Sequence, residues 1–401
     1  MDDTAVTTTV LSAWANVIEQ RDAGKAELLA RVYDGALPPD RQVEVFSALR
    51  DILPCRVVRR GEPRSLAYDD GALRNLLGLK VETAGKVNDF YDYLSLNRVA
   101  GVLIAHEGRV VLEHYDLGAG PTTFWPSMSV AKSVSTTLVG MAIKDGLIGS
   151  LDDMLEQYLP ELKGGAYQGV SVRNLLQMTS GVGWNETYTD PSSDRRRMLA
   201  LQSAGRPGAI LDLMTSLPRV AKPGAVWNYS TGETCVMGYL LRAALGRSLS
   251  EYLSEKLWKP LGMEHEAHWW LDAADGTETA GMGLNATLRD FARFGLFVLN
   301  GGCIDGKSLL PDGWFAEAGR PRTLSGGDRL DYGYMWWPTS DRDGGFSDGA
   351  FSARGIFGQR IYLNPARKTM IVELRARPKP IMEDPVDSNA FAHAVVDVLA
   401  K

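Results

Sequence analysis

The sequence predicts an α+β fold of three layers (α/β/α), in which helices flank an antiparallel sheet and a mainly helical lobe is inserted into the chain. Two pairs of short apolar runs predict the strands, one pair near residue 105 and one near residue 365, and each pair is joined by a short turn. Between these pairs, apolar residues recur at helical spacing. Because strands come from both ends of the chain, we expect one sheet assembled from the N- and C-terminal parts.

The N-terminal part predicts helices followed by a hairpin. Two helical stretches form a polar extension that Pro54 closes, and the tight turn His106–Arg109 connects a buried strand to its partner. The expected elements are helices over Val10–Ala30, Arg41–Leu53 and Val87–Leu96, and strands over Val99–Ala105 and Val110–Tyr115.

The middle part predicts helices and loops, and the C-terminal part predicts a second hairpin with its turn at Asn364–Lys368. In the middle part the expected helices are Ser171–Gln177, Gly208–Leu217, Thr234–Leu245 and Leu249–Leu257. In the C-terminal part the expected elements are strands Gln359–Leu363 and Met370–Leu374 and a closing helix over Asn389–Leu399.

This order of elements predicts three parts of the chain. Residues 1–75 form an N-terminal helical extension. Residues 76–145 and 285–401 together form the α/β sheet domain, and residues 146–284 form the helical lobe. We expect the active site in the cleft between the sheet domain and the lobe.

The composition limits the function. A length of 401 residues, 45% hydrophobic and 23% charged, is typical of a globular protein of one or two domains. The net charge of −6 argues against a nucleic-acid partner, and we expect Arg195–Arg197 to be a solvated loop. No secretory signal is recognisable and no apolar run approaches 18 residues, so we expect a cytoplasmic protein without a membrane partner.

The cysteines and histidines show no metal-binding pattern. The three cysteines are isolated and odd in number, and His265 and His268 have only Glu264 and Glu266 near them. We therefore expect no disulfide, no metal and no cofactor.

Ser129 and Lys132 are the first candidate functional residues, one helical turn apart at the start of an apolar helix. Residues i and i+3 share a helix face, so the amine can reach the hydroxyl and take its proton. Burial would favour the neutral amine that this requires. Chance alone yields about one such spacing in this composition, and the alternative is a capping serine beside a solvated lysine.

With three further segments, this motif resembles the serine hydrolases of the β-lactamase and penicillin-binding-protein superfamily. Within it, the sequence resembles the class C β-lactamases, the family VIII carboxylesterases and, most of all, the 6-aminohexanoate-dimer hydrolases, from about residue 85 to the C-terminus. The segments that carry the resemblance are Ser127–Ser133, Val172–Gly181, Trp227–Thr231, and Gly355–Gln359 with Asn364–Pro365.

The resemblance implies roles for individual residues. Ser129 would be the nucleophile, Lys132 its general base, and Tyr229 the phenol that relays protons to the leaving group. The backbone N–H groups of Ser129 and Ile356 would form the oxyanion hole.

The resemblance also implies substrate contacts. The loop Trp184–Pro191 is similar to one that supplies a substrate-contacting tyrosine, which falls on Tyr188, although a packed loop aromatic is an equal alternative. The candidate substrate-binding residues are Trp184, Tyr188, Arg354, Gly355 and Phe357.

Two departures from the family pattern argue against β-lactamase or peptidoglycan activity. Thr231 stands where β-lactam-active relatives carry Asn, and Ala353 stands where they carry the Lys that pairs with a carboxylate. Arg354 or Arg360 could replace that lysine.

We therefore expect a serine hydrolase that cleaves a small linear amide or carboxylic ester, acting as a monomer or homodimer. The alternatives are a carboxylesterase without amidase activity, a β-lactamase or DD-peptidase, and an inactive binding or scaffold protein of the same fold. Clustered aromatics such as Trp269–Trp270 and Tyr334–Trp337 indicate either an aromatic-walled cleft or core packing.

A second serine motif competes with the first. Gly345–Gly349 fits the Gly-x-Ser-x-Gly pattern, with Ser347 at its centre, and Asp384, Asp387 and His393 follow in α/β-hydrolase order. A nucleophile elbow needs a strand before the serine and a helix after it, and neither is indicated here. The context favours a loop.

Overall fold

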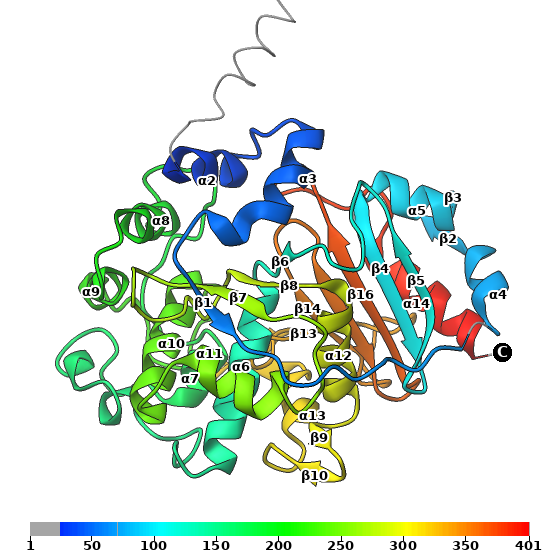
Figure 1. Cartoon of the computed structure of the whole chain (residues 1–401). Helices are drawn as coiled ribbons and strands as arrows, with labels where there is room; N and C mark the ends of the chain where they lie inside the picture. Colours follow the sequence, from blue (N-terminus) through cyan, green and yellow to red (C-terminus); the bar gives the residue numbers. More distant parts are fainter. Residues whose placement is uncertain (1–24, 70, 401) are drawn as a thin grey trace, which may run out of the picture.

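The computed structural model describes residues 25–69 and 71–400. Its centre is a six-stranded antiparallel sheet that joins strands from both halves of the chain (Figure 1). In sheet order the strands are β13 (Trp337–Pro338), β14 (Phe351–Arg354), β15 (Arg360–Asn364), β16 (Thr369–Arg375), β4 (Val99–His106) and β5 (Arg109–Tyr115). The C-terminal strand β16 pairs with β4, with Ile371 opposite Ile104, which confirms a sheet built from both ends of the chain.

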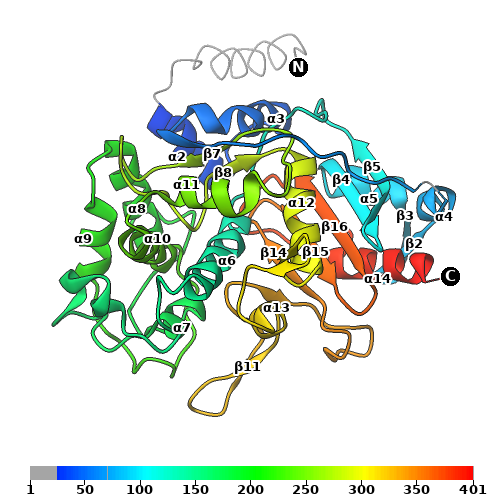
Figure 2. The same cartoon turned by 60° about the horizontal axis from the view of Figure 1, so that its bottom comes forward.

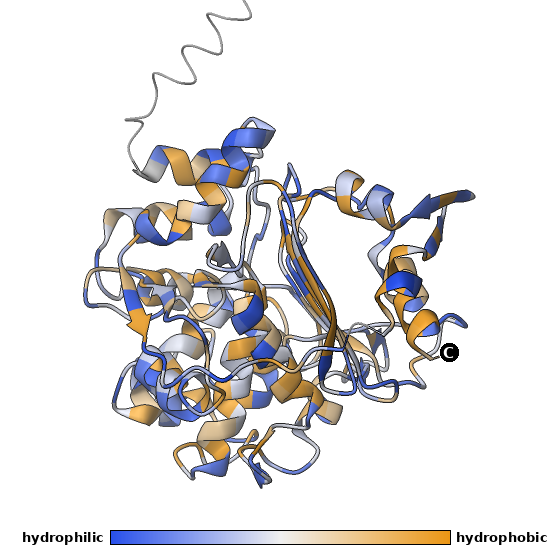
Figure 3. Cartoon of the chain, turned by 45° about the vertical axis from the view of Figure 1, so that its right-hand side comes forward, coloured by the Kyte–Doolittle hydropathy of each residue, from blue (hydrophilic) through white to orange (hydrophobic). Residues whose placement is uncertain are grey.

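Helices cover both faces of this sheet, which confirms the three-layer prediction (Figure 3). Helices α5 (Phe90–Leu96) and α14 (Ser388–Leu399) lie on one face, where Tyr93 stacks on Phe391 with ring centroids 3.7 Å apart. Helices α6 (Val130–Lys144) and α12 (Leu288–Leu299) lie on the other face. Strand residues are buried on both faces because side chains alternate between them.

A second sheet of four strands was not foreseen. Its order is β1 (Cys55–Val58), β7 (Ala267–Trp270), β8 (Leu284–Ala286) and β6 (Trp125–Pro126). Trp269 and Trp270 are fully buried, so this aromatic pair belongs to the core rather than to a cleft. Strand β6 leads directly into the segment before α6, and the sheet therefore fixes where α6 begins.

The helical lobe lies beside the sheet and contacts α6 (Figure 2). Its elements are α7 (Val172–Leu176), α8 (Asp194–Ala204), α9 (Ala209–Ser216), α10 (Thr231–Leu245), α11 (Leu249–Leu253) and a π-helical turn over Ser254–Trp258. Helix α8 corrects the prediction of a solvated loop at Arg195–Arg197. Ser193 caps this helix by accepting from the Arg196 N–H, and Arg195 is only 1% exposed.

Smaller elements complete the chain. They are α2 (Lys25–Asp34), α3 (Pro39–Ala48), α4 (Leu73–Leu77), β2 (Lys80–Thr83), β3 (Lys86–Asp89), β9 (Cys303–Ile304), β10 (Lys307–Ser308), α13 (Trp314–Ala318), β11 (Arg322–Thr323) and β12 (Arg329–Leu330). Short 3₁₀ turns occupy Leu49–Asp51, Leu155–Gln157 and Pro160–Leu162.

Two predicted helices have different bounds. The prediction of one helix over Val87–Leu96 is wrong at its start, because β3 continues to Asp89, whose side chain then caps α5 in a capping box with Asp92. The predicted helix Val10–Ala30 lies mostly outside the described residues, and α2 begins at Lys25.

The N-terminal helices pack into the main core. Tyr33 of α2 and Phe46 of α3 are each 1% exposed and belong to the same apolar cluster as α6. The three-part division of the chain remains a prediction. In the part of the chain that the structure describes, no helix combines the length and apolar character needed to cross a bilayer.

Candidate active site

Ser129 lies at the N-terminus of α6, in the short segment that connects β6 to this helix. Met128, immediately before it, has a φ of 44°, in the left-handed region that residues other than glycine seldom adopt. Ser129 is 8% exposed and Lys132 is 1% exposed. The Lys132 Nζ lies 3.0 Å from the Ser129 Oγ, so the predicted pairing of hydroxyl and amine is present in the structure.

Lys132 is held by neutral oxygen atoms. Besides Ser129, its Nζ lies 3.1 Å from Thr231 Oγ1 and donates to the carbonyl of Gly281 at 2.9 Å. Burial lowers the pKa of Lys132 to about 8, and the Glu186 carboxylate acts against that shift. A substantial fraction of the amine is therefore neutral near physiological pH and can accept a proton.

Tyr229 lies next to this pair. It precedes α10, whose N-cap is Ser230, and its ring centroid is 5.2 Å from the Lys132 Nζ. Burial and the Glu186 carboxylate raise the pKa of the Tyr229 phenol, while its hydrogen bond with Ser129 works in the opposite direction. The phenol is consequently protonated at neutral pH, as a proton donor to a leaving group must be.

Glu186 is a site residue that the sequence interpretation missed. One carboxylate oxygen accepts from the Thr231 hydroxyl, and the other accepts from the Thr231 backbone N–H at 2.9 Å and from the Trp184 indole. Since the Thr231 hydroxyl also lies within hydrogen-bond distance of Lys132, a continuous chain runs from Ser129 through Lys132 and Thr231 to Glu186. In a single sequence, Glu186 is one acidic residue in a loop, and only the fold brings it to Thr231, 45 residues later.

Tyr188 lines the side of this site that the lobe and α2 form. Its ring stacks on Tyr33 at 6.3 Å, and the Arg195 guanidinium lies 4.5 Å from the Tyr33 ring and 6.0 Å from that of Tyr188. Burial and the nearby Glu186 raise the pKa of the Tyr188 phenol. The Arg195 Nε is 4.0 Å from Glu186, which connects this aromatic stack to the hydrogen-bond chain.

The candidate oxyanion donors lie at two chain segments that approach each other. Ser129 opens α6, and Ile356 lies in the turn between β14 and β15. Gly355 allows this approach, because a Cβ there would lie 3.0 Å from the Ser127 carbonyl and 2.5 Å from Gln359 Oε1. Neither the Ser129 nor the Ile356 N–H has a hydrogen-bond partner among the described residues, so both can donate to a substrate oxygen.

The side chains of two predicted substrate-binding residues, Phe357 and Arg354, point away from Ser129 and Lys132. Phe357 is fully buried and packs edge-on against Phe46 with centroids 5.0 Å apart, so its side chain belongs to the core. Arg354 is the register partner of Arg360 and points to the sheet face that α14 covers, whereas the neighbouring Ala353 faces the α6 side. Trp184 reaches the site through its bond to Glu186.

The competing serine motif does not come together. Ser347 lies in an exposed loop and donates to Asp341 at 2.8 Å. Asp384 is engaged by Arg375 at 2.8 Å, and the His393 Nε2 lies 2.9 Å from the Ser340 carbonyl. No cluster of three or more potential metal ligands occurs among the residues that the structure describes.

Comparisons with known proteins agree on one family. The family model described as Beta-lactamase matches residues 97–395. The 6-aminohexanoate-dimer hydrolase of Paenarthrobacter ureafaciens is 29% identical over 354 residues, 84% of this chain and 85% of that protein. Penicillin-binding protein 4* of Bacillus subtilis is 21% identical over 290 residues, 59% of each chain.

Solved structures show the same fold. A Bacillus anthracis protein described as a candidate 6-aminohexanoate-dimer hydrolase superposes with a TM-score of 0.75 at 23% identity, over 89% of this chain and 93% of its own. A family VIII carboxylesterase superposes with a TM-score of 0.60 at 16% identity, over 84% and 98% of the two chains.

Proposed function

Because the chain belongs to the Beta-lactamase family of serine hydrolases, we propose that it hydrolyses a small linear amide or carboxylic ester through an acyl-enzyme on Ser129. The observation that carries the proposal is the hydrogen-bond chain Ser129–Lys132–Thr231–Glu186. It places a buried amine of lowered pKa 3.0 Å from the Ser129 hydroxyl, which can act as a nucleophile.

In the first step, the Ser129 Oγ attacks the carbonyl carbon while its proton passes to the Lys132 Nζ, 3.0 Å away. The resulting oxyanion receives hydrogen bonds from the N–H groups of Ser129 and Ile356. Lys132 becomes an ammonium ion in this step, and Glu186 stabilises that charge through the Thr231 hydroxyl.

In the second step, the tetrahedral intermediate expels its amine or alkoxide. The Tyr229 phenol donates its proton to the leaving atom and regains one from Lys132, whose ammonium lies 5.2 Å from the ring centroid. Water then attacks the acyl-enzyme by the reverse sequence of proton transfers, which releases the acid and restores Ser129.

Two site residues and two relatives support the proposed substrate class. Thr231 engages Lys132 and Glu186, and Ala353 is fully buried, so neither offers the polar group that β-lactam-active relatives use. A relative that this chain matches over 85% of its length is a 6-aminohexanoate-dimer hydrolase, which favours a linear amide. Esters of the same acyl groups are the second candidate class, because a family VIII carboxylesterase shares the fold.

Active-site labelling and substrate profiling test this proposal. We expect a fluorophosphonate probe to modify Ser129, and purified protein to cleave linear ω-amino amides or short acyl nitrophenyl esters with a burst of nitrophenol. A chromogenic cephalosporin should be turned over slowly or not at all. Absence of labelling in folded protein would favour the inactive scaffold, and rapid cephalosporin hydrolysis would contradict the interpretation of Thr231 and Ala353.

The pH dependence of the reaction tests the role of Glu186. The rate should rise with pH as Lys132 loses its proton, with an apparent pKa of about 8 in the wild type. The Glu186 carboxylate favours the ammonium form and so raises this pKa. In Glu186→Gln we therefore expect the rising limb of kcat/KM to move to lower pH by about 0.5–1 unit, with a lower maximal rate.

Thr231→Ser is the matched control, because it retains the hydroxyl that lies between Lys132 and Glu186. Its pH profile should superpose on that of the wild type. A Glu186→Gln profile that keeps its midpoint would show that the carboxylate only holds the loop in place.

A further inference from the structure

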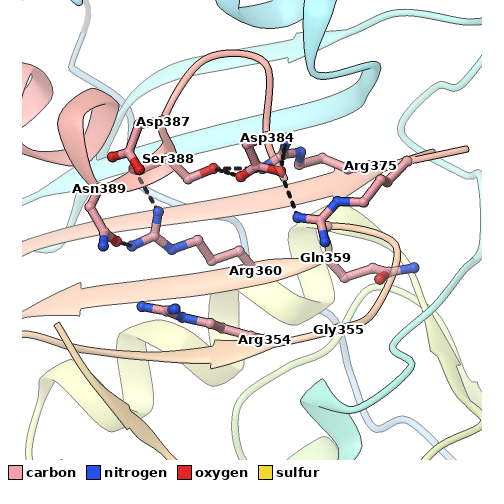
Figure 4. Close-up of a pocket in the computed structure, with 11 residues that line it drawn as sticks. Arg354, Gly355, Gln359, Arg360, Arg375, Asp384, Asp387, Ser388 and Asn389 are labelled. Atoms are coloured by element: carbon pink, nitrogen blue, oxygen red, sulfur yellow. Dashed lines mark hydrogen bonds and ion pairs between the residues drawn. The ribbon is translucent and has the colours of Figure 1, made fainter. Parts of the chain in front are cut away.

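A pocket separate from the candidate active site lies at the end of β14 and β15, on the sheet face that α14 covers (Figure 4). Its volume is about 230 Å³, and four arginines line it together with the first residues of α14. We call it the arginine pocket, defined by Arg354, Gln359, Arg360, Arg375, Arg377 and Ser388. The proposed hydrolytic mechanism uses none of these side chains.

The positive charge of the arginine pocket exceeds its negative charge. Asp384 is bound by Arg375 at 2.8 Å and by Arg377 at 2.6 Å, so these three groups form one compact ion-pair cluster. The other carboxylate, Asp387, caps α14 by accepting from the Ala390 N–H. Two of the four guanidinium groups therefore remain without a carboxylate partner.

Arg360 is held by neutral groups alone. It is 4% exposed and donates to the Ser388 carbonyl at 2.6 Å, to the Asn389 side chain at 2.8 Å and to the Ser352 hydroxyl at 3.3 Å. Arg354, its register partner, has no hydrogen bond or ion pair with any described residue, and its Cζ lies 5.8 Å from the centroid of the Trp337 ring. In Figure 4 both side chains extend toward the start of α14.

This arrangement is unfavourable without a counter-charge. Burial and the charge of Arg360 lower the pKa of Arg354 to about 9, although the carboxylates of Asp384 and Asp387 act in the opposite direction. The Gln359 side chain is 3% exposed, and its Nε2 donor has no partner. The N-terminus of α14 adds further positive potential on the same side. Arg354 and the Gln359 Nε2 are thus two donors of this pocket that lack an acceptor among the described residues.

We propose that the arginine pocket binds a small oxyanion, a carboxylate or a phosphate, between Arg354, Arg360 and the first turn of α14. The guanidinium of Arg354, unpaired among the described residues, can donate to two oxygen atoms of such an anion, and the charge of the neighbouring Arg360 adds to the attraction. The anion could be a free ion or the carboxylate end of a substrate, since Gly355 borders both this pocket and the segment before Ser129.

Calorimetric titration with sodium phosphate and with sodium acetate, at constant ionic strength, tests the site without any need for catalytic activity. We expect saturable binding of at least one of the two anions by the wild type, and at least a tenfold higher Kd for Arg354→Gln and Arg360→Gln. Arg59→Gln is the matched control, because Arg59 is an exposed arginine paired with Glu266 outside the pocket. If the control and the pocket variants bind the anion equally well, the wild type binds an adventitious ion only, and the proposal is overturned. Absence of binding by the wild type would also overturn it.

Measurement of Tm by thermal unfolding provides a second test, which does not depend on calorimetric titration of the variants. Because Arg354→Gln removes an uncompensated charge, its Tm in anion-free buffer should equal or exceed that of the wild type, and its Tm should no longer rise with phosphate or acetate. A large fall of its Tm in anion-free buffer would show that Arg354 is already compensated, and would contradict the site.

Paired substrates distinguish the two sources of the anion. If the anion is part of the substrate, Arg354→Gln should raise KM at least tenfold for the mono-4-nitrophenyl ester of glutaric acid and leave KM for 4-nitrophenyl butyrate unchanged. If the anion is a free ion, both esters should respond alike while calorimetry still shows binding that depends on Arg354. Failure of the hydrolytic proposal would leave the calorimetric result unaffected.

Discussion

Replacing Ser129 by alanine is expected to lower kcat by at least about 10³-fold, because it removes the atom that carries the acyl group. The folded structure should be unchanged, since the Ser129 hydroxyl makes no bond that holds α6 in place and its partner Lys132 keeps two further acceptors. Steady-state hydrolysis of the best ester or amide substrate measures the loss. Mass spectrometry after fluorophosphonate treatment should show that the variant is no longer labelled.

Ser347→Ala is the control for this prediction. Ser347 lies in an exposed loop and donates to Asp341, so its loss should leave both kcat and labelling as in the wild type. If instead Ser347→Ala abolished labelling while Ser129→Ala retained it, the nucleophile would be the serine of the competing motif, and the assignment of Ser129 would be wrong.

Replacing Lys132 by methionine is expected to reduce kcat by about 10³-fold, because Lys132 is the amine that lies 3.0 Å from the Ser129 hydroxyl. The residual rate should also lose the rise with pH near 8 that the Lys132 pKa imposes on the wild type. The measurement is the pH dependence of single-turnover acylation by a nitrophenyl ester. A variant that kept the wild-type profile would show that another group removes the Ser129 proton.

The same variant should be more stable than the wild type at neutral pH. The pKa of Lys132 is about 8 in the folded protein and 10.5 when unperturbed, so protonation favours the unfolded chain. This cost is fully present below pH 8 and disappears as the pH rises through 10.5. After allowance for the lost hydrogen bonds, we expect the free energy of unfolding at pH 7 to rise by about 1 kcal/mol, as measured by denaturant titration.

The fold was largely predictable because its strands are short, apolar and joined by recognisable turns. The hairpins at Val99–Tyr115 and near residue 365 are local, and the sequence marks both of their ends. The four-stranded second sheet was not predictable in this way. It pairs Cys55 with Trp270, more than 200 residues later, and no local turn indicates a pairing of that range.

The site was predictable only where its residues are neighbours along a helix. Ser129 and Lys132 share a turn of α6, so helical spacing alone brings them together. Glu186 and Arg195 lie in and after a loop, and their approach to Thr231 and Tyr33 depends on how the lobe packs. A run of three arginines is usually solvated, but Arg195 is buried. Its charge is tolerated there because the guanidinium lies near the Tyr188 ring and the Glu186 carboxylate.

The stack of Tyr33 on Tyr188 has a consequence for how this protein could diverge from its relatives. Tyr33 belongs to α2, which precedes residues 97–395, the region that the family model matches, yet its ring stacks on Tyr188, next to Glu186 of the candidate active site. Changes in α2 could therefore alter the surroundings of Tyr188 without replacing Ser129 or Lys132. Evolution, or a protein engineer, could retune which molecules enter the enzyme from a part of the chain that takes no part in its chemistry.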